Sequence, residues 1–360
     1  MINVQLLCAA AYFLTRSVEP VADRILAGLL VASVGILTPH MIGFAGFYDA
    51  FPWLSFAPFS QEFLLGPLVA AYVYALTQGA PKRIFWWCLI PAACAFGYET
   101  YWFIQPLEVK WAWAGGLHNR VISPVFTVLE SLGTIAGLLI AIWLGWRYRT
   151  WLYQTSSNSA EYDLLGLGLV LITAGLALSV AVTLELVQAF TGPFTYFGEY
   201  PFYLAFGIGA QIFALTAMLQ PENPFPKMTS EPPDRASQET METDEPDWKA
   251  TGDEIAEAIL SRDWYLEPRL SLTHVANRLN LSESLVSKSI NLGLGTNFNQ
   301  LVNGFRIERV KSALISSDLD MLSIAYDSGF NSKATFNRVF KEMVHQTPRQ
   351  FRQQAKPEVC

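Results

Sequence analysis

The stretch IAYDSGFNSKATFNRVFKEMVHQTPRQFR, residues 324–352, decides the fold of the C-terminal part of this chain. Its apolar spacing predicts two short amphipathic helices that are separated by a glycine. Gly329 supplies the left-handed turn, Phe330 fills the core behind it, and Ser332 caps the second helix. This order of elements predicts a helix-turn-helix unit.

The two helices of this unit each have an apolar face. We expect the first helix to bury Leu322, Ala325 and Tyr326, and the second to bury Phe336, Val339, Phe340 and Met343. The opposite face of the second helix is polar and cationic, with Lys333, Ala334, Asn337, Arg338 and Lys341. Such a face is suited to contact DNA.

A second unit of the same kind precedes this one. Ser271 is placed to cap a helix whose apolar residues follow the i, i+3, i+4, i+7 spacing, and Asn280 suits its C-terminal end. Ser282 begins the next helix, and Glu283 lies favourably at its positive end. A longer helix, residues 297–315, is predicted between the two units. This helix would hold both units in a fixed relation.

The second helices of the two units match in sequence. SESLVSKSI from Ser282 and SKATFNRVF from Ser332 share caps and core positions at a spacing of 50 residues, and Lys288 corresponds to Arg338. A helix fits the major groove of B-DNA, and two helices about 34 Å apart would enter successive grooves. This geometry gives a physical reason for the duplication.

These residues resemble the AraC/XylS family of bacterial transcription regulators, whose DNA-binding domain has two helix-turn-helix units joined by a long helix. The resemblance covers residues 252–352 and nothing before them. It is carried by LSLTHVANRLNLS (270–282), FNQLVNGFRIERVKSAL (298–314) and the stretch 324–352.

The resemblance implies base-facing positions in both second helices. They are Ser284, Ser287 and Lys288 in the first and Ala334, Asn337 and Arg338 in the second, with Lys333 beside them. The sequence departs from the family pattern at Ser289, where an apolar or bulky residue is more usual, and at Asn291, where a basic residue is common. Many relatives carry a soluble ligand-binding domain upstream, whereas this chain has an apolar region there.

Of the 360 residues in the chain, 52% are hydrophobic and only 15% are charged. The charged residues are unevenly distributed and divide the chain into three regions. Residues 1–220 hold 8 basic and 11 acidic residues, and residues 221–248 form an acidic, proline-rich linker. The stretch 269–356 holds 12 basic against 6 acidic residues, so the formal net charge of −7 does not exclude nucleic acid. We therefore expect a membrane domain (1–220), a linker (221–248) and a DNA-binding domain (249–360).

The first region is predicted to be a polytopic transmembrane helix bundle of about seven spans, so the whole chain is expected to be all-α. The expected spans are residues 2–14, 25–47, 63–76, 84–104, 121–146, 164–190 and 201–219. Cations gather in alternate loops, at Arg16, Arg24, Lys82, Arg83, Arg147, Arg149 and Lys227. The positive-inside rule then places the C-terminal domain in the cytoplasm, at the inner membrane of a bacterium.

Ionisable residues at membrane depth are rare and often functional. Glu130, Glu185 and His40 are the cases here, and each either contacts a signal ligand or makes a structural hydrogen bond between helices. The four histidines are scattered, and no HExxH, GxSxG or Walker-type motif occurs, so we expect neither an enzyme nor a metal or other cofactor. Cys8, Cys88, Cys94 and Cys360 have no metal-ligand spacing.

The sequence therefore predicts a membrane-bound transcription regulator that senses a signal through its apolar region. The expected partners are double-stranded promoter DNA, the lipid bilayer, a second copy of the chain, RNA polymerase and an unidentified signal ligand. One alternative is a membrane transporter or membrane enzyme with an autoregulatory or protein-binding tail. Another is a transcription factor that is released by proteolysis within residues 221–248.

Overall fold

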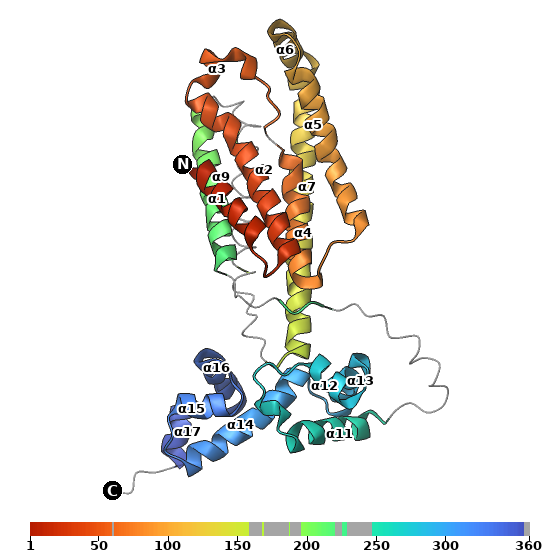
Figure 1. Ribbon diagram of the computed structural model, residues 1–360, viewed down its shortest axis with the longest axis vertical. Coiled ribbons are helices and arrows are strands. Elements are labelled where there is room, and N and C mark those ends of the chain that lie inside the picture. Colours follow the sequence, from red (N-terminus) through yellow and green to blue (C-terminus); the bar gives the residue numbers. More distant parts are fainter. Residues whose placement is uncertain are drawn as a thin grey trace. The chain divides into compact units, whose positions relative to one another are not determined.

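The structure, a computed structural model, describes residues 1–59, 61–157, 168, 187, 196–219, 225–228 and 247–355. Within these residues the regular elements are helices (Figure 1). One isolated antiparallel bridge joins Ser156 to Ser271. The chain divides into two units. Unit 1 comprises Met1–Arg147 and Leu164–Met228, and unit 2 comprises Tyr148–Asp163 and Thr229–Cys360. The expected domain boundaries at residues 220 and 248 stay a prediction. They place the segment Tyr148–Asp163 in the membrane domain, whereas the division of the structure groups this segment with unit 2.

Unit 1 is built from apolar helices. Its α-helices are α1 (Ile2–Thr15), α2 (Pro20–Phe44), α3 (Phe47–Ala50), α4 (Leu65–Gln78), α5 (Ile90–Phe103), α6 (Leu107–Trp113), α7 (Ser123–Thr155) and α9 (Tyr196–Met218). Short 3₁₀ turns (Pro52–Leu54, Glu62–Leu64 and Arg83–Leu89) and one π-type segment (Ala114–Ile122) connect some of them. α7 continues past Arg147, so its last residues belong to unit 2.

The core of unit 1 lies among α1, α2, α4 and α9, where Phe13, Leu26 and Tyr72 are buried. The backbones of α4 and α7 approach closely at Gly66 and Gly137, because a Cβ atom at either glycine would overlap backbone atoms of the facing helix. Small residues at such crossings are typical of helices that pack in a membrane.

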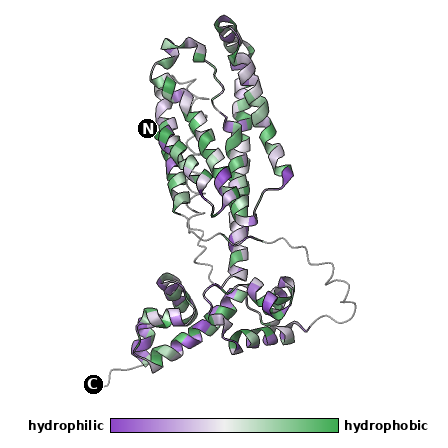
Figure 2. Ribbon diagram, viewed as in Figure 1, coloured by the Kyte–Doolittle hydropathy of each residue, from purple (hydrophilic) through white to green (hydrophobic). Residues whose placement is uncertain are grey.

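Among the residues that the structure describes, three helical segments are long and apolar enough to cross a membrane. They are Pro20–Phe44, Leu107–Thr155 and Tyr200–Met218, and Figure 2 shows the hydrophobic colouring of these helices. α1, α4 and α5 have 14 residues each, which is shorter than a full span. The expected span 164–190 falls outside the described residues, apart from residues 168 and 187. The expected count of about seven spans therefore stays a prediction.

Charged residues of unit 1 meet at one end of the bundle. The Lys227 Nζ donates to Glu19 Oε2 at 2.7 Å, and also to the carbonyls of Ala75 and Leu76 at the end of α4. The Arg16 guanidinium donates to the carbonyl of Ala217 near the end of α9. The loop after α1, the end of α4 and the segment after α9 thus lie on the same side of unit 1.

Unit 2 contains the C-terminal helices. They are α11 (Trp248–Ser261), α12 (Leu272–Leu279), α13 (Glu283–Lys288), α14 (Phe298–Ser316), α15 (Met321–Asp327), α16 (Lys333–Val344) and α17 (Pro348–Ala355), with a 3₁₀ turn at Trp264–Leu266 and a π-type turn at Ser289–Gly293. Figure 1 shows α11 to α13 at one end of α14 and α15 to α17 at the other. Each end has its own core: Val275, Val286, Ile290 and Phe298 contribute to the first, and Leu314, Phe330, Phe336 and Phe340 to the second.

Candidate nucleic-acid interface

The first helix-turn-helix unit consists of α12 and α13. The Ser271 side chain accepts a hydrogen bond from the backbone N–H of His274, and the Ser282 side chain accepts one from that of Leu285, so both predicted caps are confirmed. Asn280 ends α12 in the left-handed conformation with φ 53°, as the sequence indicates. These local contacts fix the start of α13 and hence the direction in which its side chains project.

The second helix-turn-helix unit consists of α15 and α16. Asp320 caps α15, and the Ser332 side chain accepts from the backbone N–H of Thr335 at the start of α16. Gly329 adopts φ 88° between the helices, and Phe330 is buried behind it, so both predictions are confirmed. The two helix-turn-helix units therefore share one construction, with α13 and α16 in equivalent places.

Two residues that were expected in this core are on the surface instead. Tyr326 is 49% exposed and Met343 is 39% exposed, and the predictions for both were wrong. Ile324 and Ala325 are the buried residues of α15, and Val344 packs against the core in place of Met343. Both misplaced residues lie one position away from the buried stripe, where spacing alone does not decide the side on which a residue falls.

The connecting helix α14 confirms the prediction for residues 297–315. Asn297 and Gln300 form a capping box at its start, in which each side chain accepts from the backbone N–H of the other residue. Its 19 residues span about 28 Å at 1.5 Å per residue. This length is comparable with the spacing of about 34 Å between successive major grooves on one face of B-DNA.

The structure exposes most of the expected DNA-facing side chains. Ser284 and Lys288 on α13 are exposed and Ser287 is half-buried, while Lys333, Ala334, Asn337 and Arg338 on α16 are exposed. Each set lies on one helix, opposite the residues that the helix buries. The assignment of these residues to DNA stays a prediction, which the placement of the side chains supports.

Two of the cations on these faces have partners within the protein. Arg338 forms an ion pair with Glu342 at 3.2 Å, one turn further along α16. An exposed i, i+4 pair of this kind contributes only about 0.3–0.5 kcal/mol, so a DNA acceptor can displace the carboxylate. Lys288 lies 5.9 Å from the centre of the Trp248 ring of α11. The internal partners of these two cations therefore compete only weakly with DNA.

The departure from the family pattern at Ser289 concerns packing. Ser289 is fully buried, and its backbone carbonyl lies close to Gly252 of α11, where an added Cβ would be only 2.7 Å away. It does not belong to the exposed face of α13. Asn291 is exposed, and its side chain donates to the Ser287 hydroxyl at 3.3 Å.

Sequence reasoning missed Arg306, which lies on the buried side of α14 and is 1% exposed. Its Nε donates to the carbonyl of Tyr265 at 2.7 Å, and its Nη2 donates to that of Glu267 at 2.6 Å. Burial lowers the pKa of the guanidinium to about 10, so it still carries its charge at neutral pH. Its spacing from Val302 and Val310, four residues each way, was a signal that it shares their buried face.

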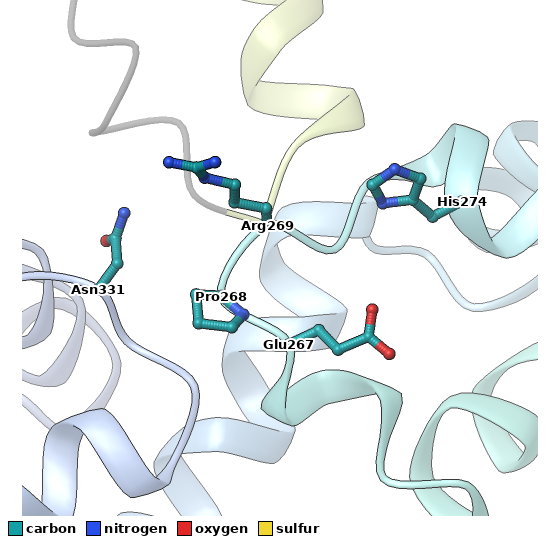
Figure 3. Close-up of a pocket in the computed structure, with 5 residues that line it drawn as sticks. All are labelled: Glu267, Pro268, Arg269, His274 and Asn331. Carbon is teal, nitrogen blue, oxygen red and sulfur yellow. The ribbon is translucent and has the colours of Figure 1, made fainter. Parts of the chain in front are cut away.

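A hollow lies where the two helix-turn-helix units meet. It has a volume of about 410 Å³ and is lined by Glu267, Pro268, Arg269 and His274 on the side of the first and by Asn331 of the second (Figure 3). The Glu267 carboxylate is held by both terminal nitrogens of Arg278, at 2.7 and 2.9 Å. Arg306 lies at the same boundary, because it binds the carbonyls of Tyr265 and Glu267 and lies against the Phe330 ring, and we call this boundary between the two helix-turn-helix units the seam.

Two of the three expected signal-sensing residues are described by the structure, and both lie in unit 1. His40 is half-buried on α2, and its ring stacks on that of Tyr203 of α9. Glu130 is half-buried on α7. Glu185 falls outside the described residues. A role for any of them in sensing stays a proposal. Among the described residues no group of histidine, cysteine and carboxylate side chains is arranged to hold a metal ion.

Comparison with known proteins finds a matching family model, similar curated proteins and a similar solved structure. A family model described as a helix-turn-helix domain matches residues 275–354. An uncharacterized HTH-type transcriptional regulator of Staphylococcus aureus (strain COL) is 41% identical over 83 residues, which are 23% of this chain and 11% of that protein. The regulatory protein PocR of Salmonella typhimurium is 35% identical over 92 residues, which are 26% of this chain and 30% of that protein. The matches thus span less than a third of these relatives.

One solved structure also matches. It is the C-terminal domain of the two-component response regulator yesN from Fusobacterium nucleatum, which is 25% identical, with 28% of this chain and 98% of that chain covered and a TM-score of 0.27. The residues that the family model matches include most of α12 and all of α13, α14, α15 and α16. The C-terminal part of this chain is therefore a helix-turn-helix domain of the AraC type.

Proposed function

We propose that this protein regulates transcription by binding specific promoter DNA through α13 and α16. The observation that carries the proposal is the duplicated construction: two capped helices, each with an exposed polar face, are joined by one continuous helix, α14. The sequence similarity to transcription regulators supports the same function. A single helix-turn-helix would read one groove, whereas the pair is suited to successive grooves.

The chemistry of α16 favours direct reading of bases. Asn337 can bridge the N6 and N7 atoms of adenine, and Arg338 can bridge O6 and N7 of guanine, each contributing about 1–3 kcal/mol of discrimination. Ser284 and Ser287 of α13 discriminate less, because a hydroxyl both donates and accepts. Lys288 and Lys333 supply positive charge for phosphates or bases. We therefore assign most of the sequence specificity to α16.

Replacing Arg338 with alanine is expected to weaken specific binding about ten- to hundredfold, because a bidentate contact to guanine is lost. Binding to unrelated DNA of the same length should change much less, since it depends on total charge. The measurement is a titration of labelled promoter DNA with the full chain in detergent micelles, at one stated salt concentration. Arg349→Ala, an exposed arginine of α17, is the control. An equal loss for specific and unrelated DNA would show that Arg338 reads no base.

We further propose that the apolar region anchors the protein in the bacterial inner membrane and senses a signal there. The support is the surface of unit 1: in the most apolar window of Leu107–Thr155 only 11% of residues are buried, and Trp143 and Trp146 are exposed. Such a helix needs either lipid or another protein chain around it. A ligand, a second copy of the chain and RNA polymerase are the proposed partners, and His40, Glu130 and Glu185 are the proposed ligand contacts.

The cytoplasmic placement of the C-terminal domain can be tested with Cys360. In a variant whose other cysteines are replaced by serine, a membrane-impermeant maleimide should label Cys360 only after spheroplasts are opened. The cations near Arg16 and Lys227 lie on one side of unit 1 and favour that side as cytoplasmic. Full labelling of intact spheroplasts would contradict this topology, and release of the protein by alkaline extraction would contradict membrane anchoring.

A further inference from the structure

The segment that directly follows α7 is part of the DNA-binding unit, although more than 110 residues separate it from the loop that it contacts. Ser156 forms an antiparallel bridge with Ser271, the cap of α12. The Ser157 hydroxyl donates to the carbonyl of Leu270 at 2.7 Å, and the Ser157 backbone N–H donates to the same carbonyl at 3.3 Å. Both serines are buried. The two residues that follow α7 are therefore held by hydrogen bonds to the loop before α12.

Three polar side chains of α14 hold the same segment. The Asn299 amide donates to the carbonyl of Ser156, and the Asn303 amide donates to that of Ser157 at 3.3 Å. The Arg306 guanidinium reaches the Ser157 carbonyl at 3.4 Å and the Ser157 hydroxyl at 3.2 Å. Asn299 is 8% exposed and Asn303 is 2% exposed. Buried polar side chains normally have hydrogen-bond partners, and here a segment distant in sequence supplies several of those partners.

The site lies at the seam between the two helix-turn-helix units. Arg306 binds the carbonyls of Tyr265 and Glu267 on the side of the first, and its guanidinium lies 5.8 Å from the centre of the Phe330 ring in the second. Gly329 also faces this loop, since a Cβ there would lie 2.7 Å from the Tyr265 carbonyl oxygen. A segment that binds Arg306 thus contacts the residue that joins the helix-turn-helix units.

We propose that Asn299, Asn303, Arg306 and the Leu270 carbonyl form a docking site for the chain's own Ser156–Ser157 segment, and that the docked segment holds the two helix-turn-helix units in the orientation that binds DNA. The proposal rests on the proposed function for its effect on DNA. Thr155, the residue before the segment, ends the apolar stretch Leu107–Thr155. One peptide bond joins Thr155 to Ser156, so a displacement of α7 would also displace the segment that is bound at the seam.

Docking can be tested by a disulfide between Ser156→Cys and Ser271→Cys in the full chain, with the four native cysteines replaced by serine. Paired residues of an antiparallel bridge have Cα atoms about 4.5–5.5 Å apart, which a disulfide can span. A protease site inserted within residues 229–246 allows the two parts to be separated. After mild oxidation in membranes and cleavage, the parts should stay joined on a non-reducing gel. The control pair is Ser156→Cys with Ser323→Cys, an exposed serine of α15.

The effect on DNA is tested with Ser157→Trp, because an indole does not fit the buried site. Its affinity for promoter DNA should fall at least about fivefold, the lower range of coupling between sites in proteins. Gln154→Trp, at an exposed position of α7, should bind as the unchanged protein does. The oxidised form of the variant that carries both Ser156→Cys and Ser271→Cys should bind at least as tightly as its reduced form.

Each result decides a separate part of the proposal. Cross-linking no greater than in the control pair overturns docking. Efficient cross-linking with unchanged affinity of Ser157→Trp overturns the coupling to DNA. If the unchanged protein itself binds no specific DNA, the proposed function fails, whereas the cross-linking result still decides whether the segment docks.

Discussion

Replacing Arg306 with alanine is expected to destabilise the DNA-binding unit by about 3–5 kcal/mol, the largest effect of any single substitution considered for this protein. The guanidinium satisfies the carbonyls of Tyr265 and Glu267, and its removal leaves both oxygens without this donor. Each unsatisfied buried carbonyl costs about 1–3 kcal/mol, and the vacated volume adds a packing cost.

This loss can be measured by urea-dependent pulse proteolysis of the full chain in detergent micelles, with detection of the C-terminal part. Arg309→Ala removes an exposed arginine from the same helix and should change the free energy of unfolding by less than about 0.5 kcal/mol. Similar unfolding midpoints for Arg306→Ala and Arg309→Ala would mean that Arg306 does not hold the two helix-turn-helix units together.

Gly329→Ala is expected to have the second largest effect, a loss of about 2–4 kcal/mol. The φ of 88° at Gly329 is unfavourable for a residue with a side chain. The added Cβ would also lie 2.7 Å from the carbonyl oxygen of Tyr265 and 2.8 Å from that of Leu266. Both are backbone atoms of the loop that Arg306 holds, so the clash cannot be relieved by a change of rotamer.

The matched control for this substitution is Gly304→Ala. Gly304 lies inside α14, where an added Cβ meets only the Met343 Cε atom, at 4.0 Å. Alanine should therefore stabilise the helix by up to about 1 kcal/mol. Both variants can be compared by the same proteolysis assay. Equal stability of the two variants would contradict the assigned conformation of the turn at Gly329.

The local features of the DNA-binding unit could be predicted because they depend on neighbouring residues. Ser271, Ser282 and Ser332 cap helices through contacts three residues away, and Gly329 adopts its turn through its own backbone. The connecting helix was predicted from its apolar spacing, and the Asn297 cap that the structure shows at its start depends on an equally local contact with Gln300. Each of these signals lies within one or two turns of the residue that it concerns.

The contacts between distant segments could not be predicted in this way. Tyr326 lies beside a buried stripe, and only the packing of α15 against its neighbours decides that it faces outward. Arg306 is charged, so a pattern of apolar residues does not predict that it lies on the buried face of α14. The docking of Ser157 against Leu270 has no local pattern at all, because two serines after an apolar helix resemble an ordinary polar end.

Hydroxyl-radical footprinting of the full chain, in detergent micelles, on the DNA upstream of its own gene at stated salt tests directly whether α13 and α16 bind one duplex together. Two helices joined by α14 should protect the sugars that border two adjacent major grooves on one face of the duplex, and Arg338→Ala should weaken the protection at one groove more than at the other. Protection at a single groove, or no specific protection there or on a pool of genomic fragments, would show that the two helices do not bind DNA together.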